Sequence, residues 1–234
     1  MEAPDTHAID ELVRQYQAEL PGLQIFRGQL EALLVSLLSA FEIPYSHVES
    51  RCKGVAEFRE KITRKGYTHP ASEMTDRIGL RAIMFYDGDV EAVVRIIRQE
   101  FTVDEVNSID RRTPAAVESF GYRSFHLVLA LDERRAALPE WAAFAGVPVE
   151  LQVRTVLAHA WAAVGHQVAY KQPPLPPDKQ RLLAQISAML ETTDILFDTL
   201  RFTPTGRDGA ISKIGPDRGA PVQAHDAGDE ERTS

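Results

Sequence analysis

The stretch Glu150–Thr155 reads Glu-Leu-Gln-Val-Arg-Thr and alternates polar with apolar side chains. Successive side chains of a β-strand point to opposite faces of the sheet. The alternation therefore predicts a strand that carries Glu150, Gln152 and Arg154 on one face and two apolar residues on the other. An acid, an amide and a guanidinium on one face of a sheet suggest a site for a metal ion and a phosphate group.

A second polar cluster precedes another apolar strand. Residues 121–126 read Gly-Tyr-Arg-Ser-Phe-His, and the apolar run that follows predicts a strand over 124–131. Tyr122 could form a stacking platform for a base, and His126 could act as a catalytic base or as a donor to phosphate. The alternatives are a core aromatic residue at a strand end and a structural histidine.

The rest of the chain alternates between strand-like and helix-like patterns. Strands are predicted at 45–50, 78–86, 101–110, 124–131 and 147–153, and helices at 8–42, 54–65, 89–100, 156–170 and 178–201. The first helix should break near Pro21-Gly22 and carry a core-facing apolar stripe from Leu30 to Phe41. Alternating strands and helices predict an α/β or α+β fold with one mixed β-sheet.

Composition divides the chain into three segments. We expect an N-terminal helical segment at 1–44, a main domain at 45–202 that includes the last helix, and a tail at 203–234. The tail is rich in Gly, Pro and charge, which predicts disorder. Arg111–Ser119 lacks periodicity and contains Pro114, which predicts a mobile loop.

The bulk composition narrows the class of protein. The 234 residues suffice for one sizeable α/β domain. No apolar run reaches membrane-spanning length, and the N-terminal residues show no basic-then-apolar signal pattern, so we expect no membrane association. A single cysteine, Cys52, cannot form an internal disulfide, which favours a cytoplasmic protein. A net charge of −8 argues against a large nucleic-acid-binding surface.

A local basic stretch stands out against this acidic background. Residues 51–65 carry six basic side chains and only two acidic ones, Glu57 and Glu60. A small polyphosphate could dock there. The alternative is a solvated helix face with oppositely charged pairs four residues apart. The basic residues are Arg51, Lys53, Arg59, Lys61, Arg64 and Lys65.

Two acids at the entrances of apolar strands could share a metal ion. Asp76 precedes the strand at 78–86, and Glu150 lies in the strand at 147–153. Mg²⁺ takes one or two protein carboxylates and completes its shell with water and substrate phosphates. The alternatives are a helix- or turn-capping aspartate and an edge-strand charge. His159 and His166 share a helix face without a third ligand, so no zinc site is predicted.

Taken together, these residues resemble the synthetase domain of the RelA/SpoT family, the ATP:nucleotide pyrophosphokinases. The likeness runs over roughly residues 45–171. It rests on five motifs in order: R-x-K with a later lysine, D-x-x-G-x-R, G-Y-x-S-x-H, E-x-Q-x-R-T and H-x-x-x-Y-K. Their residues here are Arg51, Lys53 and Lys61; Asp76, Gly79 and Arg81; Gly121, Tyr122, Ser124 and His126; Glu150, Gln152, Arg154 and Thr155; His166, Tyr170 and Lys171.

The resemblance implies a nucleotidyltransferase-like mixed sheet flanked by α-helices. It also implies that the β,γ-diphosphate of ATP moves to a ribose 3′-hydroxyl and that AMP leaves. By the same likeness, Arg51 and Arg81 would sandwich the adenine, and Lys53 and Lys61 would hold the ATP phosphates.

The likeness also implies a metal site and an acceptor site. Asp76 and Glu150 would hold Mg²⁺, and Glu150 would help to deprotonate the 3′-hydroxyl. Tyr122 would stack on the acceptor base. The acceptor and the phosphates would be ordered by Arg123, His126, Gln152 and Arg154.

The expected acceptor is GDP or GTP, which would give (p)ppGpp. The rival acceptors are the tRNA CCA end and adenosine nucleotides. The approach to Tyr122 lacks basic residues over 115–120, and residues 156–162 resemble the toxic small synthetases that an antitoxin silences. The only His-Asp pair, His225-Asp226, lies in the tail, so we expect no alarmone hydrolysis.

Two alternative functions that involve no catalysis also remain open. One is a nucleotide-binding module that kept the fold without catalysis. The other is an interaction protein whose terminal helices mediate assembly, which includes a homo-oligomer.

Overall fold

A computed structural model of the chain describes residues 6–110, 124–171 and 176–202. The chain forms two compact units, Met1–Leu200 and Arg201–Ser234. The sheet, the helices around it and the candidate site belong to the first unit. The loop expected at 111–119 and the tail expected at 203–234 lie outside the described residues.

Five strands form one mixed sheet in the order β1-β2-β5-β4-β3. Only β2 and β5 run parallel among the pairs described; the other neighbours are antiparallel. The expected mixed sheet is therefore confirmed. The strands are β1 (Tyr45–Cys52), β2 (Ile78–Met84), β3 (Phe101–Asp110), β4 (Phe125–Leu131) and β5 (Val149–Thr155).

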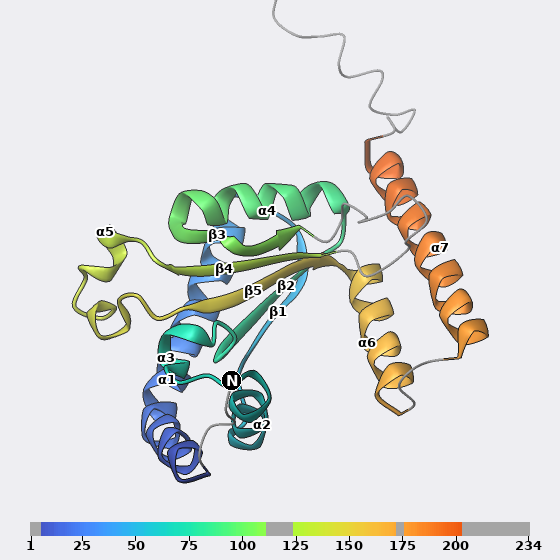
Figure 1. The fold of residues 1–234 in the computed structure, drawn as a ribbon. Coiled ribbons are helices and arrows are strands. Elements are labelled where there is room, and N and C mark those ends of the chain that lie inside the picture. Colours follow the sequence, from blue (N-terminus) through green and yellow to red (C-terminus); the bar gives the residue numbers. More distant parts are fainter. Residues whose placement is uncertain (1–5, 111–123, 172–175, 203–234) are drawn as a thin grey trace, which may run out of the picture. The chain divides into compact units, whose positions relative to one another are not determined.

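Helices flank this sheet on both sides. Figure 1 shows α4 above the sheet, and α2 and α6 below it. The helices are α1 (Thr6–Ala40), α2 (Val55–Lys65), α3 (Pro70–Glu73), α4 (Asp87–Glu100), α5 (Glu133–Ala136), α6 (Val156–Lys171) and α7 (Pro177–Phe202), with a 3₁₀ turn at Ala142–Phe144. No helix within the described ranges combines the length and the apolarity that crossing a bilayer requires.

The expected break in the first helix is wrong. α1 runs without interruption from Thr6 to Ala40 with Pro21 inside it. A proline in a helix removes one backbone hydrogen bond and crowds the preceding turn. Here Tyr16 and Leu23, on either side of Pro21, are buried in the same hydrophobic core. Tertiary packing on both sides therefore outweighs the local penalty.

The apolar face of the sheet packs against α1 and α4. Apolar residues of β2, β4 and β5 form one core with the buried stripe of α1, including Leu30, Leu34 and Leu38, and with buried residues of α4. Phe41, which was expected in that stripe, lies beyond the end of α1 and is 49% exposed. Burial on this side leaves the opposite face of the sheet for polar side chains.

A buried tyrosine links α1 to the start of α2. The hydroxyl of Tyr16 donates a hydrogen bond of 2.6 Å to the carbonyl oxygen of Lys53, and its ring stacks on Phe58 at 4.0 Å. Burial, the largest cause, raises the pKa of Tyr16 to about 12. These contacts fix the backbone of Lys53 where β1 turns into α2.

Two carboxylates of α7 bind the starts of other helices. Thr155 Oγ1 donates to Asp194 Oδ2 at 2.8 Å, and Gly88 N donates to Asp198 Oδ2 at 3.1 Å. Both partners lie at helix starts, where unpaired backbone N–H groups and the helix dipole favour negative charge. The apolar residues that the sequence places on this helix, including Leu182, Ile186 and Ile195, stay largely exposed.

Candidate active site

The polar face of the sheet brings residues from four strands into two rows. Residues paired across neighbouring strands lie side by side on the same face. One row contains Glu49, Arg81, Gln152 and His126. In the next row, Gly79 lies between Arg51 and Glu150. The strand alternation predicted at 150–155 is therefore confirmed.

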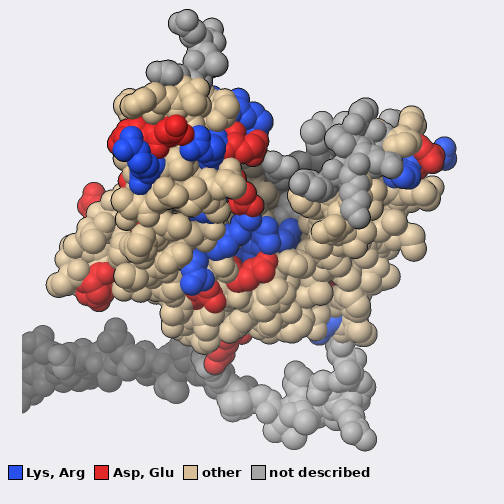
Figure 2. All heavy atoms as spheres, turned by 90° about the horizontal axis from the view of Figure 1, so that it is seen from below, with Lys and Arg blue, Asp and Glu red and all other residues tan. Residues whose placement is uncertain are grey.

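A cavity lies over these rows and contains about 530 Å³ of empty space, part of it open to solvent. Seen from the side of α2 and α6, Lys and Arg atoms lie next to Asp and Glu atoms in a hollowed central region (Figure 2). The lining residues of the cavity are Glu49, Ser50, Arg51, Asp76, Gly79, Leu80, Arg81, Glu150 and Gln152.

Glu150 is the most strongly perturbed acid in this cavity. Its Oε1 accepts a hydrogen bond of 2.8 Å from Gln152 Nε2 and lies 3.4 Å from His126 Nδ1. The hydrogen bond from His126 lowers the pKa of Glu150 to about 2, although burial opposes the shift and Gln152 contributes less. Glu150 is therefore ionised at neutral pH, which suits a metal ligand and makes it a weak base.

Asp76 lies in the turn before β2 and is paired with two lysines. Lys53 Nζ lies 2.9 Å from Asp76 Oδ2, and Lys61 Nζ lies 2.8 Å from Asp76 Oδ1. Lys53 is 7% exposed, so its ammonium group depends on this carboxylate for compensation. The positive charge of Lys61 also helps to lower the pKa of Glu150. The two acids and the two lysines thus form one electrostatic cluster.

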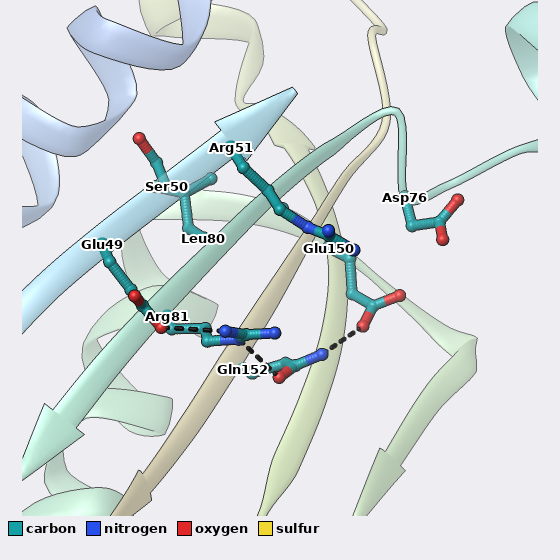
Figure 3. Close-up of a pocket in the computed structure, with 9 residues that line it drawn as sticks. Glu49, Ser50, Arg51, Asp76, Leu80, Arg81, Glu150 and Gln152 are labelled. Atoms are coloured by element: carbon teal, nitrogen blue, oxygen red, sulfur yellow. Dashed lines mark hydrogen bonds and ion pairs between the residues drawn. The ribbon is translucent and has the colours of Figure 1, made fainter. Parts of the chain in front are cut away.

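A chain of hydrogen bonds crosses the floor of the cavity. Arg81 Nη1 donates to Glu49 Oε1 at 2.9 Å, and Arg81 Nε donates to Gln152 Oε1 at 3.1 Å. Gln152 in turn donates to Glu150, so four side chains from three strands are connected (Figure 3). The first two of these hydrogen bonds hold the guanidinium of Arg81, while Arg51 contacts Glu57 at 3.5 Å.

Gly79 has no Cβ atom, and this leaves the space between Arg51 and Glu150 open. A Cβ atom at this position would lie 4.0 Å from Arg51 Cγ, which is ordinary contact. The fold would therefore accept a larger residue here, but its side chain would enter the cavity.

Most of the site residues predicted from the sequence meet in this region. Five line the cavity, two pair with Asp76, and His126 contacts Glu150. Arg154 is 5% exposed and lies on the same face of β5 without lining the cavity. Tyr122 and Arg123 lie outside the described residues, as do the side chains of Tyr170 and Lys171.

Two residues that contribute to this region, Glu49 and Thr155, were assigned no role from the sequence alone. Glu49 pairs with Arg81 and lies two residues before Arg51, so strand alternation places it on the same face. Thr155 was quoted only as part of a motif. Its Oγ1 accepts from Ala158 N at 3.0 Å and so caps α6.

The donor set fits Mg²⁺. Asp76 and Glu150 both line the cavity, and the low pKa of Glu150 keeps its oxygens available. Carboxylate oxygens are the protein ligands that Mg²⁺ prefers. In Figure 3 the two carboxylates lie on the same side of the cavity.

The pKa of Glu150 predicts a pH-dependent contribution to folding. An acid whose folded pKa lies below its ordinary value of 4.5 stabilises the fold above that value, and the contribution is lost as the pH falls toward about 2. The contribution at neutral pH is on the order of 3 kcal/mol. Denaturant unfolding between about pH 6 and pH 3 should show a steeper loss of stability in the wild type than in Glu150→Gln. Equal slopes would contradict this origin of the shift.

Known proteins share both the sequence pattern and the fold. The model of the region found in RelA/SpoT proteins matches residues 50–174. GTP pyrophosphokinase YjbM of Bacillus subtilis is 33% identical over 172 residues, which covers 68% of this chain and 77% of YjbM. GTP pyrophosphokinase YwaC of the same organism is 30% identical over 133 residues, or 55% of this chain and 60% of YwaC.

A solved structure shares the fold over most of the chain. The small alarmone synthetase 1 from Bacillus subtilis, bound to its product pppGpp, aligns with a TM-score of 0.66 and 26% identity. The alignment covers 80% of this chain and 97% of that protein.

Proposed function

The chain belongs to the RelA/SpoT family, and from this membership we propose that it is an ATP-dependent pyrophosphokinase that makes (p)ppGpp. It transfers the β,γ-diphosphate of ATP to the ribose 3′-hydroxyl of GDP or GTP. The new bond joins O3′ to the β-phosphorus, the bond between the β-phosphorus and the oxygen bridging to the α-phosphorus breaks, and AMP leaves. The observation that carries the proposal is that Asp76 and Glu150 line one cavity together with Arg51 and Arg81.

The basic side chains in and beside the cavity suit the binding of a nucleoside triphosphate. Phosphoryl-type transfer needs in-line placement and charge neutralisation more than covalent chemistry. Arg51 and Arg81 present guanidinium planes that can stack on adenine while keeping their charge. Lys53 and Lys61 exchange their contacts with Asp76 for contacts with the ATP phosphates.

We assign Mg²⁺ to Asp76 and Glu150. When bound there, the ion neutralises charge that develops on the transferred diphosphate. The low pKa of Glu150 makes metal binding its first role, and orientation of the 3′-hydroxyl its second. His126 and Gln152 hold the Glu150 carboxylate in place through the contacts described above. Tyr122 and Arg123 remain proposed contacts of the acceptor, together with Arg154.

Assembly and location form part of the proposal. The exposed apolar residues of α7 support a homo-oligomer, and the single cysteine supports a cytoplasmic location. A tRNA acceptor and a neutralising antitoxin belong to the alternative, a toxic small synthetase.

Transfer of label from ATP tests the function. The full chain is incubated with Mg²⁺, with ATP labelled in the γ-phosphate, and with GDP, GTP, ATP or tRNA in turn. We expect label on GDP and GTP. Label on tRNA or on adenosine nucleotides alone would assign the chain to the toxic class. Nucleotide binding without transfer to any acceptor would contradict the enzyme and favour a binding module.

A further inference from the structure

At the edge of the nucleotide cavity, two histidines meet Glu49, which also lines that cavity, on the polar face of the sheet. His47 and Glu49 lie two residues apart on β1, so their side chains share a face. His159 reaches them from the first turn of α6. One ligand atom from each of the three lies within 4.8 Å of the others.

We propose that His47, Glu49 and His159 form a second metal site, selective for Zn²⁺ or a similar divalent transition metal. Two imidazoles and one carboxylate form a donor set that zinc takes in proteins, with a fourth position left for water. Mg²⁺ prefers oxygen ligands alone, so this site differs in chemistry from the Asp76 and Glu150 pair.

The spacing of the donors requires only a small closure. Ligands about 2.1 Å from a tetrahedral zinc ion lie about 3.4 Å from one another. The donor atoms therefore need to approach by no more than about 1.4 Å. His47 is exposed and can supply this movement by a change of rotamer.

Neighbouring groups already orient the ligands. His47 Nδ1 lies 3.2 Å from Ser46 Oγ, and when that nitrogen carries the proton, the lone pair of Nε2 is available to bind a metal. Glu49 Oε1 accepts from Arg81, which leaves Oε2 as the ligand oxygen. The rings of His47 and His159 pack edge to face at 5.6 Å.

His159 supplies the strongest single observation. Its Nδ1 is buried, and no group among the residues that the structure describes hydrogen bonds to it. A buried polar atom without a partner is costly and calls for an explanation. A metal ion bound at that nitrogen would supply the missing partner. Burial, followed by the charge of Arg154, also lowers the pKa of His159, which keeps the imidazole neutral for coordination.

Metal titration tests the site without reference to enzyme activity. Metal-free full-length protein is titrated with Zn²⁺ by calorimetry and with Co²⁺ by visible absorption, in excess Mg²⁺ to fill the carboxylate pair. We expect one ion per chain and tetrahedral Co²⁺ bands. His47→Ala and His159→Ala should each weaken binding by at least about 10-fold, since even outer-shell changes cost that much.

A matched control separates this site from surface histidines. His69 is exposed and distant from the cluster in sequence, so His69→Ala should bind the ion like the wild type. Circular dichroism establishes that each variant is folded, and His159→Gln replaces His159→Ala if the latter is not. Equal affinity of the wild type and the His47→Ala/His159→Ala double variant would overturn the proposal, as would the absence of binding to the folded wild type.

Discussion

Glu150→Gln is expected to reduce the rate of diphosphate transfer by at least about 10³-fold. Removing one electrostatic stabiliser from such a site costs on the order of 10²–10³, and this change also removes a metal ligand. An amide keeps the size of the side chain and can still pair with Gln152; because the carboxylate contributes about 3 kcal/mol to folding at neutral pH, circular dichroism establishes that the variant is folded before its rate is measured. Steady-state transfer rates at saturating ATP, acceptor and Mg²⁺ measure the effect.

The control for this change removes the same charge elsewhere. Glu105 pairs with Arg98 at 2.9 Å on β3, away from the cavity, so Glu105→Gln should keep the wild-type rate. If Glu150→Gln keeps more than about a tenth of the wild-type rate, Glu150 does not hold the metal in the reaction.

Asp76→Asn is expected to abolish transfer to a similar extent and also to destabilise the fold by about 3 kcal/mol. The reason is Lys53, which is 7% exposed and pairs with Asp76 at 2.9 Å. Removing one member of a buried ion pair leaves the other charge without compensation, and this costs more than the pair itself contributes. Denaturant unfolding at neutral pH measures the stability, and the transfer assay measures the rate.

A double variant separates the two effects of Asp76. In Asp76→Asn/Lys53→Met the unpaired ammonium is gone, so we expect stability to recover while transfer stays absent. Unchanged stability of Asp76→Asn would show that Lys53 finds another partner. Recovery of transfer in the double variant would remove Asp76 from the metal site.

Local pattern was enough to predict the strands and most helices. The alternation at Glu150–Thr155 has the period of a strand and determines which face each side chain takes, and the apolar run after Asp76 indicates a buried strand. The pairing of β2 with β5 then brings Arg81, Glu150 and Gln152 together, so residues of two separate sequence motifs line the same cavity.

Features that depend on distant partners could not be predicted in this way. Pro21 predicts a break in the helix. The structure shows why the helix continues: Tyr16 and Leu23, on either side of Pro21, are buried in the same core. His47 and His159 are far apart in the chain, so the sequence offered His159 no third ligand. The sequence also did not indicate that Asp194 and Asp198 would bind the starts of α6 and α4, because both partners lie far away in the chain.

The hydrogen-bonded chain of Glu49, Arg81, Gln152 and Glu150 has a consequence for protein engineering. Each inner member uses both of its neighbours as hydrogen-bond partners, so exchanging one alone leaves a partner without a match. Designers who wish to change the nucleotide preference of this enzyme should vary these four residues as a unit, in combinatorial libraries rather than by successive single substitutions.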